Sequence, residues 1–266
     1  RAVIRLGAIG CLFAGTAIAH AATNYWVGTN GADWFTPNNW SLLAAPVAGD
    51  DVIITNAGVN VSLTNSTPYL GSFTITNKTL TFTNWGTVLV AANVSIMNSG
   101  VLAVQGPFTT NQMSNQVYII CTNFTLDAGG SINANGRGFM RSPTPNYSYG
   151  YGPGGGYTFF NRGSGGGHGG AGGANFEGTT GGINGTNDSP SAPGIPGSGG
   201  GAKTGGDTGG DGGGLITIQA SNGTVTINGT ISANGNNTFG AGSGAAARAV
   251  ASTSTAPHSA AAPRVC

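Results

Sequence analysis

The chain has 266 residues, of which 50 are glycine and 6% are charged, and its formal net charge is +1. So few charged residues exclude helical surfaces laced with Glu and Lys, and without a basic stripe nucleic acid is not an expected partner. Asn, Thr, Ser and Gly dominate the polar positions, which is typical of turns and of the solvent-facing positions of β-strands.

Residues 1–21 are predicted to be a secretory signal peptide. Arg1 and Arg5 flank the start of an apolar stretch over residues 6–19, and small residues at Ala19 and Ala21 permit cleavage before Ala22. The stretch is too short for a comfortable membrane span, and no second stretch of span length follows. We therefore expect an exported chain, extracellular or at the cell surface, with no transmembrane segment after cleavage.

An aromatic cluster occupies residues 22–51, ahead of the first repeat. It includes Trp26, Trp34 and Trp40. Exposed aromatic rings could stack on sugars, but the end of a repetitive β-structure needs an apolar cover for its first repeat. We predict that this segment is an N-terminal cap.

Apolar pairs with period two then recur at a nearly constant step between positions 52 and 138. The first set is Val52/Ile54, Phe73/Ile75 and Val94/Ile96, and the second set is Val59/Val61, Leu80/Phe82 and Val101/Ala103, each with a step of 21. A further copy, displaced by 23, is Val117/Ile119 followed by Phe124/Leu126, and a third pair falls at Val88/Val90 and at Ile132/Ala134. Asn56, Asn77 and Asn98 lie between the first two sets, where corners are expected.

This repeat predicts an all-β chain folded as a right-handed parallel β-helix (a β-solenoid), with three short strands in each coil. Equivalent apolar residues would then stack into internal ladders and bury a core that no single coil could bury. The alternative is an antiparallel β-sandwich, which explains strands at intervals of about 8–12 residues. It does not require the same residue classes to return at a fixed step of 21.

Residues 139–214 are a glycine-rich insertion or loop, with 29 glycines between positions 150 and 214. Such a stretch cannot form a core of its own, so it is either disordered or a compact loop in which backbone approaches backbone. The strand pattern resumes in residues 215–244, at Ile216/Ile218, Val225/Ile227 and Ile231/Ala233. Residues 226–235 also echo residues 125–136, which indicates an insertion between consecutive coils.

The composition changes at residue 245, and residues 245–266 are interpreted as an aberrant low-complexity tail. A nucleotide sequence that encodes residues 245–255 can be read one base earlier. In that frame it encodes a glycine-rich peptide followed by apolar residues, similar to residues 212–218 at the start of a predicted strand. A frameshift is therefore one interpretation, and a genuine linker is the other. Either way, we do not expect the tail to join the fold.

No catalytic residues and no cofactor-binding motif are predicted. The candidate metal ligands are Asp207 and Asp211, because their glycine-rich surroundings resemble calcium-binding glycine/aspartate repeats, although the spacing of the aspartates differs. His168 is predicted to be a solvated loop residue, and Cys121 a small core residue. The pair Asp50 and Asp51 is predicted to cap the turn before a strand.

Residues 24–54 resemble the opening module of secreted bacterial glycine-rich β-helix surface proteins of the autotransporter-like and adhesin-like kind. The resemblance is carried by Tyr25-Trp26, Trp34, Asn39-Trp40, Pro46 and the run Gly49-Asp50-Asp51-Val52-Ile53-Ile54. It implies a structural or adhesive protein of the cell surface, with surface glycans or other envelope components as partners. The alternative is an N-terminal fragment of a carbohydrate-active β-helix enzyme.

Overall fold

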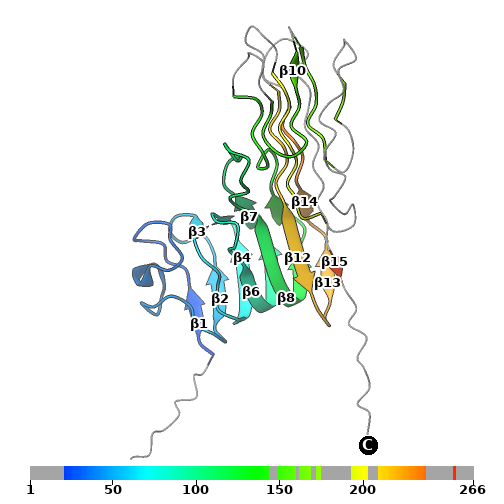
Figure 1. Ribbon diagram of the computed structural model, residues 1–266. Coiled ribbons are helices and arrows are strands. Elements are labelled where there is room, and N and C mark those ends of the chain that lie inside the picture. Colours follow the sequence, from blue (N-terminus) through cyan, green and yellow to red (C-terminus); the bar gives the residue numbers. More distant parts are fainter. Residues whose placement is uncertain are drawn as a thin grey trace, which may run out of the picture.

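The protein is almost entirely β-structure in the computed structural model (Figure 1). The structure describes residues 21–143, 149–159, 162–168, 172–174, 193–202, 209–237 and 254–255, so the predicted signal peptide lies outside the described residues except for its last position. One short 3-10 helix, η1 (Pro37–Asn39), is the only helix among these residues. The sequence-based prediction of an all-β chain is confirmed.

Two sheets contain nearly all of the strands. The larger sheet consists of β1 (Thr23–Tyr25), β2 (Asp51–Ile54), β4 (Leu70–Thr76), β6 (Leu89–Met97), β8 (Val117–Leu126), β12 (Ile216–Ala220), β13 (Val225–Ile227) and β15 (Ser254–Thr255). The smaller sheet consists of β3 (Val61–Leu63), β5 (Thr79–Phe82), β7 (Val101–Val104), β9 (Ser131–Asn133) and β14 (Thr230–Ser232).

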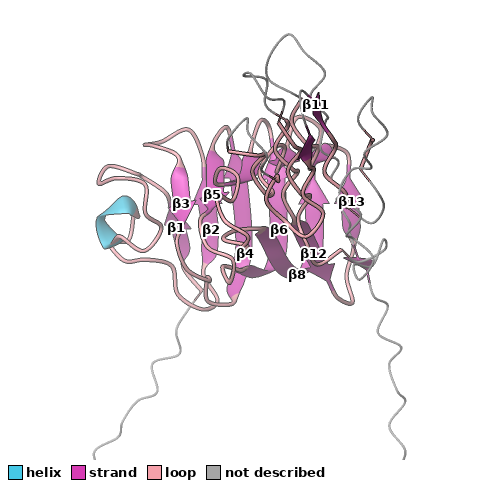
Figure 2. Cartoon of the chain, turned by 45° about the horizontal axis from the view of Figure 1, so that its top comes forward, coloured by secondary structure: helices cyan, strands magenta, loops and turns pink. Residues whose placement is uncertain are grey.

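Within both sheets every strand pair is parallel, and from β2 to β9 the chain alternates between the two sheets. Figure 2 shows the strands of the two sheets in successive layers along the molecule. The one antiparallel strand pair in the described parts of the chain lies outside these sheets, between β10 (Thr158–Phe159) and β11 (Arg162–Gly163). The antiparallel sandwich considered from the sequence is therefore wrong.

The first predicted ladder has the expected register over its first three members. Val52 pairs with Phe73 and Phe73 pairs with Val94, so the predicted step of 21 is confirmed twice. The next step is longer than predicted, because Val94 pairs with Phe124 and not with Val117. The segment between β7 and β8 is therefore a larger excursion than the two extra residues expected.

The second predicted ladder is partly wrong in register. The inward pairs of the smaller sheet are Val61/Leu63, Leu80/Phe82 and Leu102/Val104, which are buried partners of one another. Val59 is instead 48% exposed, in the turn before β3, and the predicted Val101 and Ala103 face outward, because the inward face of β7 is one residue away from the predicted one. Turns of unequal length separate the strands, and a shift of one residue moves every side chain to the other face of a strand.

The third predicted pair has the same error at Val88/Val90. Alternation in β6 places Leu89 and Ala91 inward, and these pair with Ile119 and Cys121 of β8. In β6 and β8 two adjacent outward residues interrupt the alternation, at Ala92-Asn93 and at Thr122-Asn123. Each long strand thus changes facing once. β6 presents two inward pairs, whereas β8 presents three inward residues followed by a pair.

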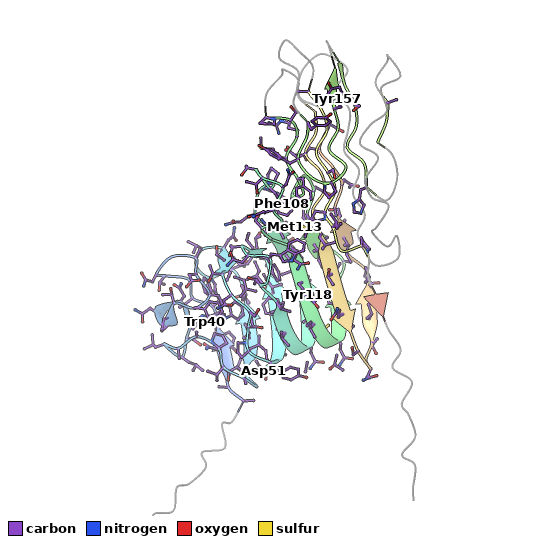
Figure 3. The ribbon with its side chains drawn as sticks, viewed as in Figure 1. Trp40, Asp51, Phe108, Met113, Tyr118 and Tyr157 are labelled. Atoms are coloured by element: carbon purple, nitrogen blue, oxygen red, sulfur yellow. The ribbon has the colours of Figure 1, made fainter. Side chains whose placement is uncertain are left out.

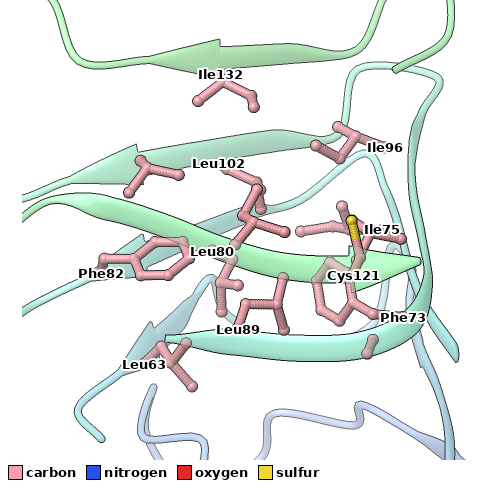
Figure 4. Close-up of a cluster of buried hydrophobic side chains, with 14 of the residues drawn as sticks. Leu63, Phe73, Ile75, Leu80, Phe82, Leu89, Ile96, Leu102, Cys121 and Ile132 are labelled. Carbon is pink, nitrogen blue, oxygen red and sulfur yellow. The ribbon is translucent and has the colours of Figure 1, made fainter. Parts of the chain in front are cut away.

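The inward side chains of the two sheets form one continuous core (Figure 4). Phe73, Ile75 and Ile96 of the larger sheet contribute to the same cluster as Leu80 and the other inward residues of the smaller sheet, and all are fully buried. Burying such a side chain stabilises the fold by about 1.5–3 kcal/mol relative to exposure. The core therefore follows from the stacking of like residues on neighbouring parallel strands.

Positive φ at two asparagines marks the corners between the sheets. Asn77 (φ 51°) and Asn98 (φ 42°) both follow strands of the larger sheet. Asparagine tolerates this left-handed conformation better than most residues other than glycine. The N–H of Asn77 also donates to the carbonyl oxygen of Asn98 at 3.0 Å, so that successive corners are bonded to each other.

The described parts of the glycine-rich segment are a compact arrangement of extended chains that reaches beyond the sheets in Figure 1. Hydrogen bonds link its neighbouring chains at every third position. Phe139 and Ser142 donate to Gly197 and Gly200, and Gly197 and Gly200 donate in turn to Gly213 and Gly210. An interval of three is the repeat of a polyproline II helix, whereas a β-strand returns to the same neighbour at every second position.

Glycine is needed in this arrangement because the backbones touch. A Cβ atom on Gly212 would overlap the carbonyl oxygen of Gly197, and one on Gly199 would overlap that of Met140. Neither glycine has the left-handed φ that otherwise explains its choice. Of the two possibilities raised by the sequence, the described parts of this segment match the compact loop.

After this segment the strands return to the sheets as the sequence predicts. Ile216 pairs with Val117, and Val225 pairs with Phe124. Thr226 pairs with Thr125 and Ile231 with Ile132, so residues that the sequence echo aligns are strand partners. The tail differs from expectation, because β15 pairs with β12 in parallel. Without β15, β12 would be an edge strand with unpaired backbone groups, and such an edge accepts a further strand.

Candidate functional surface

The acidic pair before β2 has a structural role. Asp50 is buried, and its carboxylate accepts hydrogen bonds from the N–H groups of Ala22 and Val47 at 3.2 and 2.9 Å. Asp51 accepts a bond of 2.6 Å from the hydroxyl of Ser72 on the neighbouring strand. Both carboxylates therefore stabilise the start of the larger sheet, in keeping with the predicted capping of this turn.

Asp211, one of the two candidate calcium ligands, is buried in an ion pair. Its oxygens accept bonds from the Arg141 guanidinium at 2.9 and 3.1 Å, from the Arg141 N–H at 2.9 Å and from the Asn236 amide at 3.3 Å. A calcium ion at this carboxylate would have to displace Arg141. Asp207 lies outside the described residues, and within them no three His, Cys, Asp or Glu side chains cluster to hold a metal.

Cys121 lies in the core and not at a reactive site. It is 5% exposed on β8, and burial raises the pKa of its thiol from 9.0 to about 11. A thiol with this pKa is protonated at neutral pH and is a poor nucleophile. His168 is half-buried rather than fully solvated.

The tryptophans of the N-terminal segment cover the first strands. Trp26, Trp34 and Trp40 are at most 1% exposed, with edge-to-face contacts at centroid distances of 5.1 and 4.8 Å. Trp34 also packs against Phe73 of β4 at 6.2 Å. Figure 3 places Trp40 inside this end of the molecule. These three rings are therefore buried against the first strands, and they are not available to stack on a ligand.

A column of hydroxyl groups faces outward on the larger sheet. Thr74, Ser95, Thr125 and Thr226 are partners on the consecutive strands β4, β6, β8 and β13. All four are partly exposed, and in the part of the chain described their hydroxyls have no protein hydrogen-bond partner. Parallel strands hold such groups about 4.8 Å apart. The column is thus a regular, uncharged polar surface.

A tilted ring contact between the exposed Tyr149 and the partly exposed Tyr157 is the feature that the sequence did not reveal. Tyr149 is 61% exposed, and its ring centroid lies 4.7 Å from that of Tyr157 at an interplanar angle of 38°. In Figure 3 Tyr157 lies toward the end of the glycine-rich segment that is farthest from the sheets. The only signal in the sequence is that tyrosines are spaced among glycines, which does not predict a contact.

Comparison of the chain with family models, with curated proteins and with solved structures finds no match. No helix within the described residues is long and apolar enough to span a membrane.

Proposed function

We propose that this chain is an exported protein of the cell surface or extracellular space with a structural or adhesive role. Its architecture would be a right-handed parallel β-helix with three short strands in each coil, repeating at a step of about 21. The observation that carries the proposal is the outward hydroxyl column, because it repeats one uncharged group on successive strands.

The strand order supports the proposed β-helix. Successive strands of each sheet are parallel neighbours, and the chain passes through the other sheet between them. Parallel crossover connections are right-handed in about 98% of cases. The change of facing within β6 and β8 would supply the third side of each coil, since it divides one long strand into two inward-facing stretches.

The surface chemistry supports a role in contact with neutral partners. The carboxylates of Asp50, Asp51 and Asp211 all accept hydrogen bonds from within the protein. The groups that face solvent on the larger sheet are hydroxyls, such as those of Thr74 and Ser95. A surface of hydroxyl and amide groups binds by many weak hydrogen bonds and not by long-range attraction. Surface glycans and other envelope components fit this description.

Secretion and adhesion can be tested in one host. The full chain, expressed in a bacterium with a general secretory system, should appear outside the cytoplasm with Ala22 as its first residue. The purified secreted chain should then bind to glycan-coated or cell-envelope surfaces without changing the glycan. Retention in the cytoplasm would contradict export, and cleavage of a polysaccharide by the chain would favour the carbohydrate-active alternative.

A further inference from the structure

The loop between the buried tryptophans and β2 exposes apolar side chains to solvent. Leu43 is 71% exposed, Val47 56% and Leu42 50%, and Ala44 and Ala48 are exposed as well. In Figure 1 the N-terminal segment that contains this loop is the dark-blue end of the molecule, opposite β13. Single exposed apolar residues are common on protein surfaces, but five of them between positions 42 and 48 indicate a surface that contacts another apolar phase.

Hydrogen bonds to buried side chains hold the main chain of this loop in place. The Asn24 side chain accepts from the N–H of Leu42 at 3.3 Å and donates to the carbonyl oxygen of Ala44 at 2.9 Å. The N–H of Val47 donates to the buried Asp50 carboxylate at 2.9 Å. The loop is therefore ordered before any partner arrives, which reduces the entropic cost of binding.

Leu43 has a backbone conformation that leucine disfavours. Its φ is 55°, in the left-handed region where glycine and asparagine are much more frequent. It is also the most exposed of the large apolar side chains in the described part of the chain, so packing within the protein does not offset the strain. Strained residues of this kind cluster at functional sites. Contact with an external apolar phase explains a leucine at this position, whereas the fold itself does not.

Two tyrosines flank the loop, and the loop itself carries no charge. The N–H of Ser41 donates to the carbonyl oxygen of Tyr25 at 2.9 Å, and the N–H of Gly49 donates to that of Tyr69 at 2.8 Å, so one tyrosine lies next to each end. Both tyrosines are about half-exposed. Tyrosine is enriched at the boundary between water and lipid, because its ring is apolar and its hydroxyl is polar. Residues 34–49 contain no charged side chain, so placing the loop in lipid removes no charge of its own from water.

A lipid surface fits this loop better than a second copy of the chain. A stable interface between two proteins buries about 800 Å² on each partner and involves about 20–30 residues a side. The exposed apolar side chains here come from one short loop and two neighbouring tyrosines, which is far smaller. A bilayer surface does not require this area or a matching shape, since a few apolar side chains can enter it individually.

We propose that residues 42–48 insert into the surface of a lipid bilayer, with Tyr25 and Tyr69 at the water–lipid boundary. Apolar burial drives this contact, so it requires no anionic lipid. β1 directly follows the predicted signal peptide, so export brings this end of the fold closest to a membrane. The inference rests on the proposed export of the chain and names lipid among the envelope components that it contacts. The loop is a separate surface from the outward hydroxyl column.

The test measures co-sedimentation of the secreted chain with vesicles of phosphatidylcholine, which has no net charge. Leu43→Asn should weaken binding about tenfold, because it removes an apolar side chain that lipid would bury. The melting temperature of this variant should be unchanged or higher, since asparagine tolerates the left-handed φ. Ile120→Thr is the matched control, because Ile120 is 36% exposed on β8, away from the loop, and it should bind like the unaltered chain.

Equal vesicle binding by Leu43→Asn and by the unaltered chain would overturn the proposal. So would binding that requires anionic phosphatidylglycerol and disappears in high salt, since charge would then drive it. A dimer that depends on Leu43, with no vesicle binding, would assign the loop to a second copy instead. If the chain is secreted and adheres to envelope surfaces but binds no vesicles, the lipid surface is wrong and the proposed function stands. If the purified chain binds vesicles through Leu43 but cells retain it in the cytoplasm, the lipid surface is supported and the proposed function fails.

Discussion

The indole N–H of Trp40 donates a hydrogen bond of 2.6 Å to the main-chain carbonyl oxygen of Trp34, inside the cap that covers the first strands. Both rings are fully buried. The indole nitrogen of Trp34, by contrast, is buried with no hydrogen-bond partner among the described residues. The two rings are thus equally buried, but only the indole N–H of Trp40 is hydrogen-bonded within the described structure.

This difference predicts unequal effects of the same substitution. Trp40→Phe should lower the free energy of unfolding by about 1–3 kcal/mol more than Trp34→Phe, because it leaves the Trp34 carbonyl buried and unsatisfied. Trp34→Phe removes an indole N–H that makes no bond within the described structure, at a similar loss of volume. Urea denaturation of both variants measures the difference, and equal destabilisation would show that the bond contributes nothing.

The register of the first ladder predicts which of two neighbouring residues is critical. Phe73 is fully buried and its neighbour Thr74 faces outward. Phe73→Ala should cost about 3–5 kcal/mol of stability, whereas Thr74→Ala should change it by less than about 0.5 kcal/mol. Chemical denaturation of the two variants gives both values. A reversed order would mean that β4 is displaced by one residue from the register described.

Backbone packing in the glycine-rich segment predicts that single methyl groups are harmful there. A Cβ at residue 212 would overlap the Gly197 carbonyl, so Gly212→Ala should destabilise this segment by about 1–3 kcal/mol. Gly86→Ala is the control, since a Cβ at that position would meet no atom within 4 Å and its φ is not left-handed. That change should be neutral or stabilise by up to about 1 kcal/mol. Limited proteolysis reports local opening, and equal protection of the two variants would contradict close backbone packing.

The Arg141–Asp211 pair predicts independence from calcium. Because Arg141 occupies the carboxylate, the melting temperature should be the same with chelator as with millimolar calcium. Asp211→Asn should cost about 1.5–3 kcal/mol through loss of the charge-assisted bonds. Asp127→Asn serves as the control, since this partly exposed side chain makes no such ion pair in the described structure. A calcium-dependent rise in melting temperature that Asp211→Asn abolishes would restore the calcium site.

Burial of Cys121 predicts slow reaction with a thiol reagent. In a Cys266→Ser background, the mature chain should resist a disulfide reagent at pH 8 when folded and react fully in urea, since the pKa of about 11 keeps the buried thiol protonated. The raised pKa also implies that the contribution of this thiol to stability is complete below pH 9. It declines as the pH rises toward 11, because the unfolded thiol ionises first. Rapid labelling of the native chain would place Cys121 outside the core.

The sequence was sufficient to predict the β-class and the first ladder, because Val52, Phe73 and Val94 recur at one fixed step. It was insufficient for the smaller sheet, where turns of different length precede strands of similar composition. In β7 all four residues are apolar, and only the length of the preceding turn decides that Leu102 and Val104 point inward in place of the predicted Val101 and Ala103. Turn length changes facing without changing composition, so the pattern alone could not resolve it.

The glycine-rich segment and the tyrosine pair could not be predicted for a different reason. Contacts such as that between Phe139 and Gly197 join residues far apart in the chain and involve only backbone atoms. Glycine is identical at every such position, so no side-chain pattern identifies partners. The ring contact of Tyr149 with Tyr157 depends on this backbone arrangement and was equally hidden.

Paired strands are separated by very different lengths of chain, and this affects both the entropy and the rate of folding. Phe73 on β4 pairs with Val94 on β6 after a short connection, whereas Val117 on β8 pairs with Ile216 on β12 only after the whole glycine-rich segment. The entropy of closing a flexible loop grows only with the logarithm of its length, so the longer connection costs only about 1.4 kcal/mol more. The rate of folding is more sensitive, because distant contacts form slowly. A stack of this kind can therefore accommodate a large excursion between two strands with little loss of stability, and the main cost is the time it takes to fold.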